Sequence, residues 1–139
     1  MDLNFKDRKV VITGASEGIG RALALAFANA EAKVAGCARG AARLTELSSV
    51  IEGPGHLFKQ LDLAKAKDIQ QFYHDVMKAF GGVDILINNA GDIFKSETFF
   101  GLTDEDWEDS FQINLMSAVR MSRAFIPALR NSGAPRIIN

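Results

Sequence analysis

A glycine-rich turn near the amino terminus constrains the fold of this chain more than any other feature. Residues 9–13, Lys-Val-Val-Ile-Thr, form a β-branched run that predicts a buried strand. Residues 21–28 are rich in good helix formers and predict a helix. Between them, Gly14, Gly18 and Gly20 have the spacing Gly-x-x-x-Gly-x-Gly. Such a turn lets the chain pass directly from strand to helix, and it lets an anionic ligand approach the backbone at the helix N-terminus.

Further apolar segments alternate with helical segments along the rest of the chain. We expect strands at residues 33–37, 56–61, 83–88 and 136–139, and helices at residues 41–51, 65–80 and 103–129, the last disturbed near Pro127. Strands that alternate with helices in this way form a parallel sheet through right-handed crossovers. The sequence therefore predicts one α/β domain over residues 1–139, a doubly wound parallel sheet of the Rossmann type. We expect about five strands in the order 3-2-1-4-5, with the domain incomplete at the fifth strand.

Composition and motif spacing exclude several other functions. The net charge of −1 gives no reason to expect nucleic acid or a membrane as a partner. Cys37 is the only cysteine and no apolar run approaches ~20 residues, so we expect a cytoplasmic protein. Gly20 is followed directly by Arg21 and not by Lys-Ser or Lys-Thr, which excludes the P-loop of nucleoside triphosphatases. His, Cys, Asp and Glu show no metal-ligand spacing, and we expect no metal.

Two motifs together resemble the short-chain dehydrogenase/reductase family over the whole chain. The first is Thr-Gly-x-x-x-Gly-x-Gly at residues 13–20, and the second is Asn-Asn-Ala-Gly at residues 88–91, after the fourth expected strand. The resemblance implies an oxidoreductase that transfers a hydride between a nicotinamide dinucleotide and a carbonyl or alcohol substrate. It also implies a set of cofactor-binding residues: Gly14, Ser16, Glu17, Gly18, Ile19, Gly20, Asp62, Leu63, Asn89, Ala90 and Gly91.

Each motif has a simpler structural interpretation. The glycine turn alone is also typical of close helix packing, and Asn88 and Asn89 are also typical of a polar exit from a strand. The resemblance implies that Asp62 accepts a hydrogen bond from the adenine amino group and that the next backbone amide contacts the ring. Asp62 is equally suited to cap the helical segment that follows it, and it can do both.

The end of the second expected strand indicates which nucleotide binds. An NAD site usually has Asp or Glu there, to accept a hydrogen bond from the ribose 2′-hydroxyl. This chain has Arg39 instead and no acid until Glu46. A guanidinium pairs well with a 2′-phosphate, so we expect NADP(H) rather than NAD(H), with Ser16 or Arg43 assisting Arg39. Two observations keep the alternative open: Arg39 is also typical of a solvated loop, and Glu17 stands where many NADP-preferring members of the resembled family carry Arg or Lys.

The groups for proton transfer are only partly present. The resembled family uses a Tyr with a Lys four residues later, a Ser that orients the substrate, and an Asn in the preceding long helix. Asn114 matches that Asn, and apolar neighbours at positions 111, 115 and 119 predict that it lies near the inward face of its helix. Tyr73 is the only tyrosine, and Met77 follows it by four residues, so we expect Tyr73 to pack in the core.

We expect the chain to bind a cofactor without turnover, in one of two settings. The first is the cofactor-binding part of a longer oxidoreductase, and the second is a non-catalytic nucleotide-binding or interaction module that needs a partner chain. Trp107, Phe99 and Phe100 are expected to pack the last helix and its loop. An uncovered fifth strand and an outward apolar helix face would also make the chain a homo-oligomer.

Overall fold

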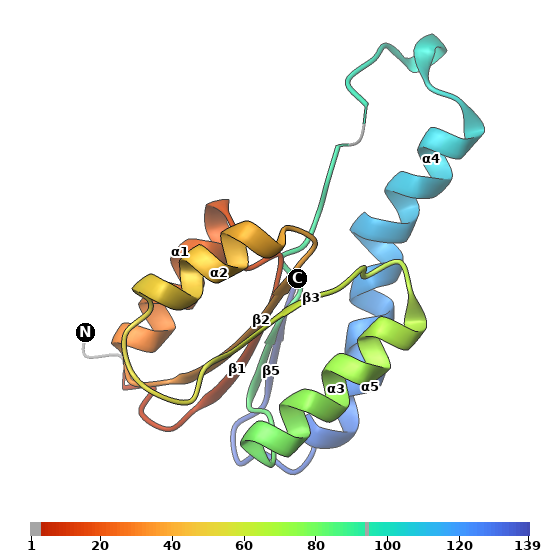
Figure 1. The fold of residues 1–139 in the computed structure, drawn as a ribbon. Coiled ribbons are helices and arrows are strands. Elements are labelled where there is room, and N and C mark those ends of the chain that lie inside the picture. Colours follow the sequence, from red (N-terminus) through yellow and green to blue (C-terminus); the bar gives the residue numbers. More distant parts are fainter. Residues whose placement is uncertain (1–3, 94) are drawn as a thin grey trace.

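Five parallel strands form one sheet in the order β3-β2-β1-β4-β5, in a computed structural model that describes residues 4–93 and 95–139 (Figure 1). The strands are β1 (Lys9–Thr13), β2 (Lys33–Ala38), β3 (Leu57–Gln60), β4 (Ile85–Ile87) and β5 (Arg136–Ile138). The helices are α1 (Gly18–Asn29), α2 (Ala41–Val50), α3 (Ala66–Phe80), α4 (Asp104–Phe111) and α5 (Ser117–Leu129), with a 3-10 turn η1 (Phe99–Gly101) and a π-helical segment η2 (Gln112–Met116). The expected fold class and strand order are confirmed.

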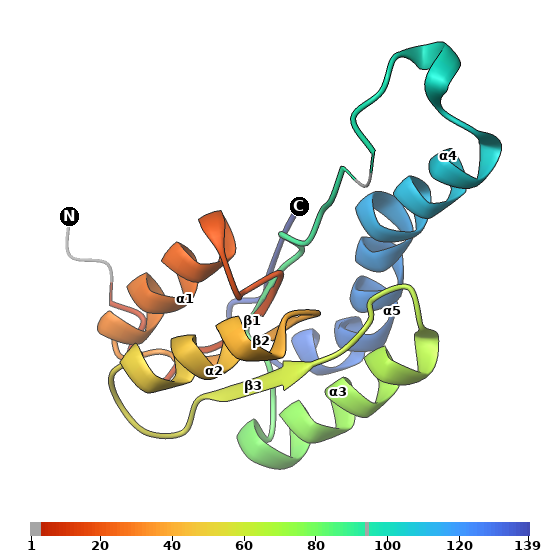
Figure 2. The same ribbon diagram turned by 45° about the horizontal axis from the view of Figure 1, so that its top comes forward.

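Helices cover both faces of the sheet. Figure 2 shows α1 and α2 together on one face, and α3 and α5 on the other. Successive residues of β1 point to opposite faces: Val10 and Ile12 belong to the core beneath α1 and α2, and Val11 to the core beneath α3 and α5. All three side chains are fully buried. This explains why β1 is a continuous apolar run, as a central parallel strand must be. Among the described residues, no helix is both long and apolar enough to cross a membrane.

The long helix expected at residues 103–129 is formed, but with an irregularity that the sequence did not indicate. It begins with a capping box, in which the Thr103 hydroxyl accepts from the Asp106 amide (3.2 Å) and the Asp106 carboxylate accepts from the Thr103 amide (2.8 Å). The π-helical segment η2 then separates α4 from α5. Pro127 lies inside α5, which continues to Leu129, so the departure from α-helical geometry lies at η2 and not at Pro127.

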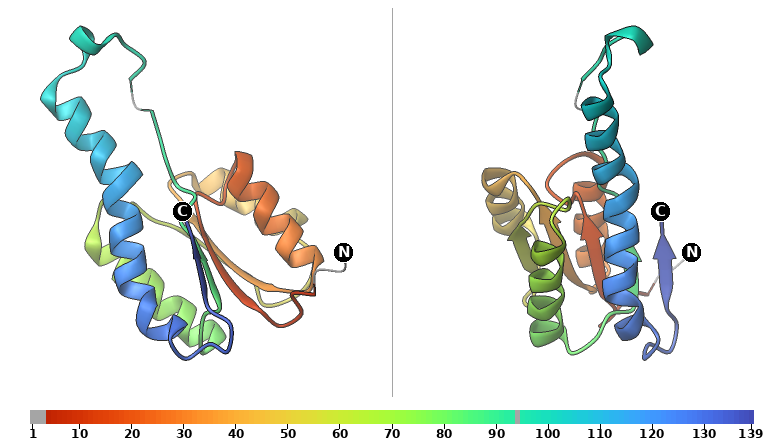
Figure 3. Two further views of the ribbon diagram at one scale, coloured as in Figure 1. Left: turned by 180° about the vertical axis from the view of Figure 1, so that it is seen from behind. Right: turned by 90° about the vertical axis from the view of Figure 1, so that its right-hand side faces the viewer.

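The orientation expected for this helix was wrong. Phe111 and Leu115 are 56% and 49% exposed, whereas Ile113, Met121 and Phe125 face the core. The helix has apolar residues on two faces, and their spacing alone does not tell which face meets the sheet. The packing expected for the aromatic residues was also wrong: Phe99 and Phe100, in the loop before the helix, are 73% and 95% exposed, and Trp107 in α4 is 46% exposed. Figure 3 shows the segment around η1 and α4 extending beyond the end of the sheet.

Asp84 joins three segments at the amino end of the sheet. Its carboxylate accepts hydrogen bonds from the Lys9 amide (2.9 Å) and the Ser132 hydroxyl (2.5 Å), and it lies 3.7 Å from the Arg8 guanidinium. Partial burial raises the pKa of Asp84, but the hydrogen bonds from Ser132 and Lys9 and the charges of Arg8 and Lys9 outweigh that effect. The net pKa of Asp84 is therefore lower than usual.

We predict that Asp84→Asn lowers the free energy of unfolding by about 1–2 kcal/mol at neutral pH. Because the pKa of Asp84 is lowered in the folded state, its stabilising effect is present above the unfolded pKa of about 3.9 and is lost as the pH falls through the folded pKa. Urea unfolding should thus show a difference from wild type at about pH 7 that shrinks as the pH is lowered below about 3.9. Asp109→Asn, at an exposed position on α4, is the control. A difference independent of pH would contradict this account.

Candidate nucleotide-binding site

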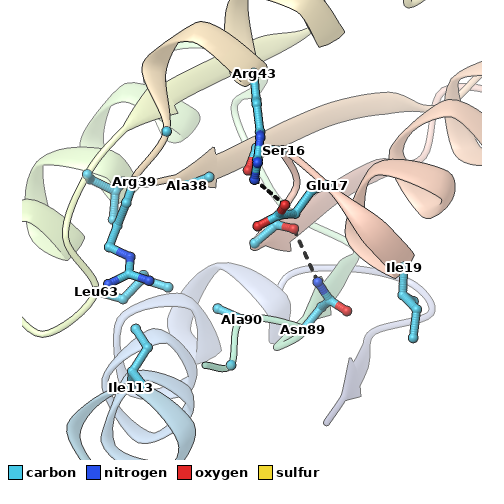
Figure 4. A pocket seen from close by; sticks show the side chains of 14 residues that line it. Ser16, Glu17, Ile19, Ala38, Arg39, Arg43, Leu63, Asn89, Ala90 and Ile113 are labelled. Carbon is cyan, nitrogen blue, oxygen red and sulfur yellow. Dashed lines mark hydrogen bonds and ion pairs between the residues drawn. The ribbon is translucent and has the colours of Figure 1, made fainter. Parts of the chain in front are cut away.

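A cleft of about 630 Å³ opens at the carboxyl ends of the strands (Figure 4). It lies where β1 is flanked by β2 on one side and β4 on the other, so the strand order reverses at this point. Open parallel sheets bind ligands at such switch points, and the volume suits a cofactor. The cleft is lined by residues from four strand exits, from the first turns of α1 and α2, and from η2: Gly14, Ser16, Glu17, Ile19, Ala38, Arg39, Gly40, Arg43, Leu61, Leu63, Asn89, Ala90, Gly91 and Ile113.

The glycine-rich turn forms one wall, and its first and last glycines have little or no room for a side chain. Gly14 has φ +66°, in the left-handed region that favours glycine. A Cβ at Gly20 would lie 2.1 Å from the Gly14 carbonyl oxygen and 2.5 Å from the Asn89 amide nitrogen. A Cβ at Gly14 would lie 3.0 Å from the Ala90 Cα, so the turn lies directly against the backbone of the β4 exit. Helix α1 begins at Gly18 with no side-chain cap, and the carboxylate of Glu17, the residue before it, pairs with Arg43.

The β4 exit is fastened to the end of β1 by hydrogen bonds. The Asn89 side-chain amide donates to the carbonyls of Thr13 (3.1 Å) and Gly14 (3.3 Å). The Thr13 hydroxyl accepts from the Ala90 amide (2.9 Å) and donates to the Ile87 carbonyl (3.4 Å). Thr13 is part of the glycine motif but was not among the site residues predicted from the sequence. A hydroxyl at the buried end of a strand was the signal for its role.

Two ion pairs place cations and anions at the same cleft. Arg39 pairs with Asp92, which follows Gly91 at the β4 exit, and Arg43 on α2 pairs with Glu17 in the glycine turn. Figure 4 shows Arg43 reaching Glu17, while Arg39 is directed towards Leu63 and Ile113 across the cleft. All four charged side chains are partly exposed. This end of the cleft therefore contains two guanidinium groups, each with a carboxylate beside it.

Asn114 lies in η2 and binds the chain that leaves β4. Its side-chain amide donates to the carbonyls of Asp92 (2.8 Å) and Ser110 (3.0 Å), and its oxygen accepts from the Asp92 amide (3.0 Å). A Cβ at Gly91 would lie 2.8 Å from that oxygen, so glycine is needed for this contact. Asn114 is exposed and not on the inward face, which corrects the expected orientation. Single π-helical turns occur frequently at functional sites.

The structure brings most of the expected cofactor-binding residues together. The residues that do not line the cleft are Gly18 and Gly20, which form the turn behind it, and Asp62. The Asp62 carboxylate accepts from the Ala64 amide (3.0 Å) and lies 3.7 Å from the Lys65 ammonium, so its contacts here are those of a turn before α3. Its contact with adenine stays a prediction. Four lining residues were not predicted from the sequence, and each is next to a residue that was: Ala38, Gly40, Leu61 and Ile113.

Cys37 and Tyr73 have structural roles, and the described residues offer no metal site. Burial raises the pKa of the Cys37 thiol to about 12, more than the Gly14 backbone hydrogen bond lowers it, so Cys37 is an inert filler under the turn. Tyr73 packs edge-on against Phe125, with ring centroids 5.2 Å apart, as expected. Within residues 4–93 and 95–139, no three of His, Cys, Asp and Glu lie close enough together to hold a metal ion.

Known proteins share this sequence pattern and this fold. The short chain dehydrogenase family model matches residues 8–139. An uncharacterized oxidoreductase of Bacillus subtilis, YvrD, is 36% identical over all of this chain and 52% of its own length. An NADPH-dependent pterin aldehyde reductase of Arabidopsis thaliana is 35% identical over 88% of this chain and 51% of its own. The chain thus spans about half the length of these curated relatives.

A solved structure agrees with the family match. A Pseudomonas syringae protein assigned to the short chain dehydrogenases superposes with a TM-score of 0.91 and 31% identity, over 99% of this chain and 59% of that one. The match of the family model covers nearly the whole chain, and the strand order and the two motifs agree with it. The chain therefore belongs to the short chain dehydrogenase family.

Proposed function

We propose that this chain is the NADP(H)-binding part of an oxidoreductase that transfers a hydride between the nicotinamide and a carbonyl or alcohol substrate. The observation that carries the proposal is Arg39 at the end of β2, on the lining of the cleft, with Arg43 on the same rim. In dinucleotide-binding folds the residue about 20 positions after the glycine motif contacts the ribose 2′ position, and a cation there suits a 2′-phosphate. The name of the Arabidopsis relative, an NADPH-dependent aldehyde reductase, supports both the nucleotide and the carbonyl class.

The residues of the cleft suggest how the dinucleotide is held. The uncapped start of α1 and the amides of the glycine turn suit the diphosphate, because helix N-termini attract anions. Arg39 suits the 2′-phosphate, while Asp62 and Leu63 would contact the adenine. Asn89, Ala90 and Gly91 would border the nicotinamide ribose. When bound, the cofactor supplies or accepts the hydride, and Asn114 would hold a water for the proton relay in the complete enzyme.

A non-catalytic module is the second candidate, and one observation favours it. The only tyrosine, Tyr73, is packed against Phe125, and the residue four positions later is Met77. A Tyr-x-x-x-Lys pair is therefore not supplied by these 139 residues. Both candidates bind the same nucleotide, and we expect neither to oxidise NADPH with the 139 residues alone. They differ in whether a further segment or a partner chain supplies the missing groups.

The compartment and the partners follow from charge and thiol content. We propose the cytoplasm, because the single cysteine is a buried thiol and no internal disulfide is possible. With a net charge of −1, the chain has no general attraction for nucleic acid or for an anionic membrane. The partners that we propose are a dinucleotide, a carbonyl or alcohol substrate and a second copy of the chain.

Arg39→Ala tests the nucleotide assignment. We predict that it weakens NADPH binding about ten-fold or more and changes NADH binding less than about two-fold, because only the 2′-phosphate needs the guanidinium. Fluorescence titration of both nucleotides measures the change. Arg123→Ala, at an exposed position on α5, is the matched control and should change neither affinity. Tighter binding of NADH than of NADPH by the wild type, or no loss with Arg39→Ala, would sink the assignment.

Gly20→Ala tests the role of the glycine turn. The added Cβ would meet the Gly14 backbone at 2.1 Å, so the turn must move and NADPH affinity should fall at least about ten-fold. Gly40→Ala is the control, because Gly40 also lines the cleft but its Cβ would meet nothing within 4 Å. Circular dichroism should show that both variants fold. Equal affinities for the two variants would contradict a binding role for the turn.

Self-association is the remaining prediction for this function. Trp107, Phe111 and Leu115 form an exposed apolar stripe along one long helix, whose first half is acidic and whose second half carries arginines. An antiparallel pair of such helices would bury the stripe and bring opposite charges together. We expect a dimer by sedimentation equilibrium that Phe111→Glu disrupts. Phe100→Glu, at the exposed tip of η1, should leave the dimer intact. A monomeric wild type would refute the prediction.

A further inference from the structure

The carboxylate of Asp92 forms an ion pair with Arg39, the residue that the proposed function assigns to the cofactor phosphate. Arg39 leaves β2 on one side of β1, and Asp92 follows β4 on the other side, 53 positions later in the chain. Their ion pair therefore joins the two rims of the cleft. The Asp92 side chain is 33% exposed, and that of Arg39 is 55% exposed. A ligand that needs the Arg39 guanidinium must compete with this carboxylate.

Asp92 is held in place independently of its ion pair. Asn114 accepts a hydrogen bond from the Asp92 amide (3.0 Å) and donates one to the Asp92 carbonyl (2.8 Å). Both bonds involve the backbone, so they do not depend on the charge of the side chain. The carboxylate is thus presented to Arg39 from a fixed point of the chain. Removing its charge should leave the local backbone unchanged.

The competition acts on one kind of nucleotide only. A 2′-phosphate carries between one and two negative charges near neutral pH, and to bind the Arg39 guanidinium it would have to displace the Asp92 carboxylate from it. A ribose 2′-hydroxyl is uncharged and does not need the guanidinium, so it does not compete with Asp92. The ion pair between Glu17 and Arg43 has the same arrangement, a carboxylate beside a guanidinium, and both residues line the same cleft.

We propose that Asp92 is a specificity-determining residue, an internal anion that weakens binding of the 2′-phosphorylated dinucleotide and leaves binding of the unphosphorylated one unchanged. The inference rests on the proposed NADP(H) function and adds a residue that opposes it. Asp92 reduces the preference in binding affinity for NADPH over NADH, and removing its charge should increase that preference. The residue acts through Arg39, so its effect requires that side chain.

Asp92→Asn tests the inference, because asparagine keeps the size and the backbone bonds and removes the charge. NADPH and NADH are titrated against wild type, Asp92→Asn, Arg39→Ala and the double variant at low ionic strength. We expect Asp92→Asn to tighten NADPH binding about three- to ten-fold and to change NADH binding less than about two-fold. The gain should shrink with added salt and disappear in the Arg39→Ala background. Asp109→Asn removes one charge from exposed α4, outside the cleft lining, and should change neither affinity.

The alternative outcomes distinguish this inference from the proposed function. Weaker NADPH binding by Asp92→Asn would mean that the carboxylate orients Arg39 for the phosphate, and it would overturn the inference alone. Equal gains for NADPH and NADH would mean a general charge effect and would also overturn the inference alone. If neither nucleotide binds to the wild type or to any variant, the proposed function fails and the inference fails with it.

Discussion

The close contact between the glycine turn and the β4 exit is the constraint on which the rest of the site depends. Gly20 touches the Gly14 carbonyl and the Asn89 side chain so closely that no Cβ fits, and Asn89 in turn binds the carbonyls of Thr13 and Gly14. This contact fixes the start of α1 beside the point where the strand order reverses. The cleft therefore lies at that point because two strand exits are fastened together there, and its lining side chains come from the loops around the contact.

The fold was predictable because each of its signals is local. The β-branched run of β1 is buried on both faces, and the structure reproduces its bounds. Strand β3 begins at Leu57 and not at His56, because His56 bonds to β2 through its side chain and not through its backbone. Its Nδ1 accepts from the Val34 amide (3.1 Å), and its Nε2 lies 2.9 Å from the Glu52 carbonyl, to which it donates. A side chain thus satisfies the backbone amide that a longer β3 would otherwise bind, and sequence periodicity does not contain that information.

The site was predictable in its backbone and not in its charges. The glycine turn and the residues after β4 follow from motif spacing, because strand exits of a parallel sheet meet at one edge. The ion pairs join residues 53 and 26 positions apart, and nothing in the local sequence indicates which acid reaches which arginine. The orientation of Asn114 was also beyond reach, since the helix is apolar on two faces and η2 changes its winding.

These contacts connect the cleft with the long helix. Arg39 is paired with Asp92, and both backbone groups of Asp92 are bonded to Asn114 in η2. Asp92 thus contacts both Arg39, which we propose binds the cofactor phosphate, and Asn114, which we propose serves the proton relay. A ligand that draws Arg39 away from Asp92 would leave the backbone bonds to Asn114 intact, because they do not involve the carboxylate. The charges at the cleft rim can therefore change while the position of Asn114 is kept.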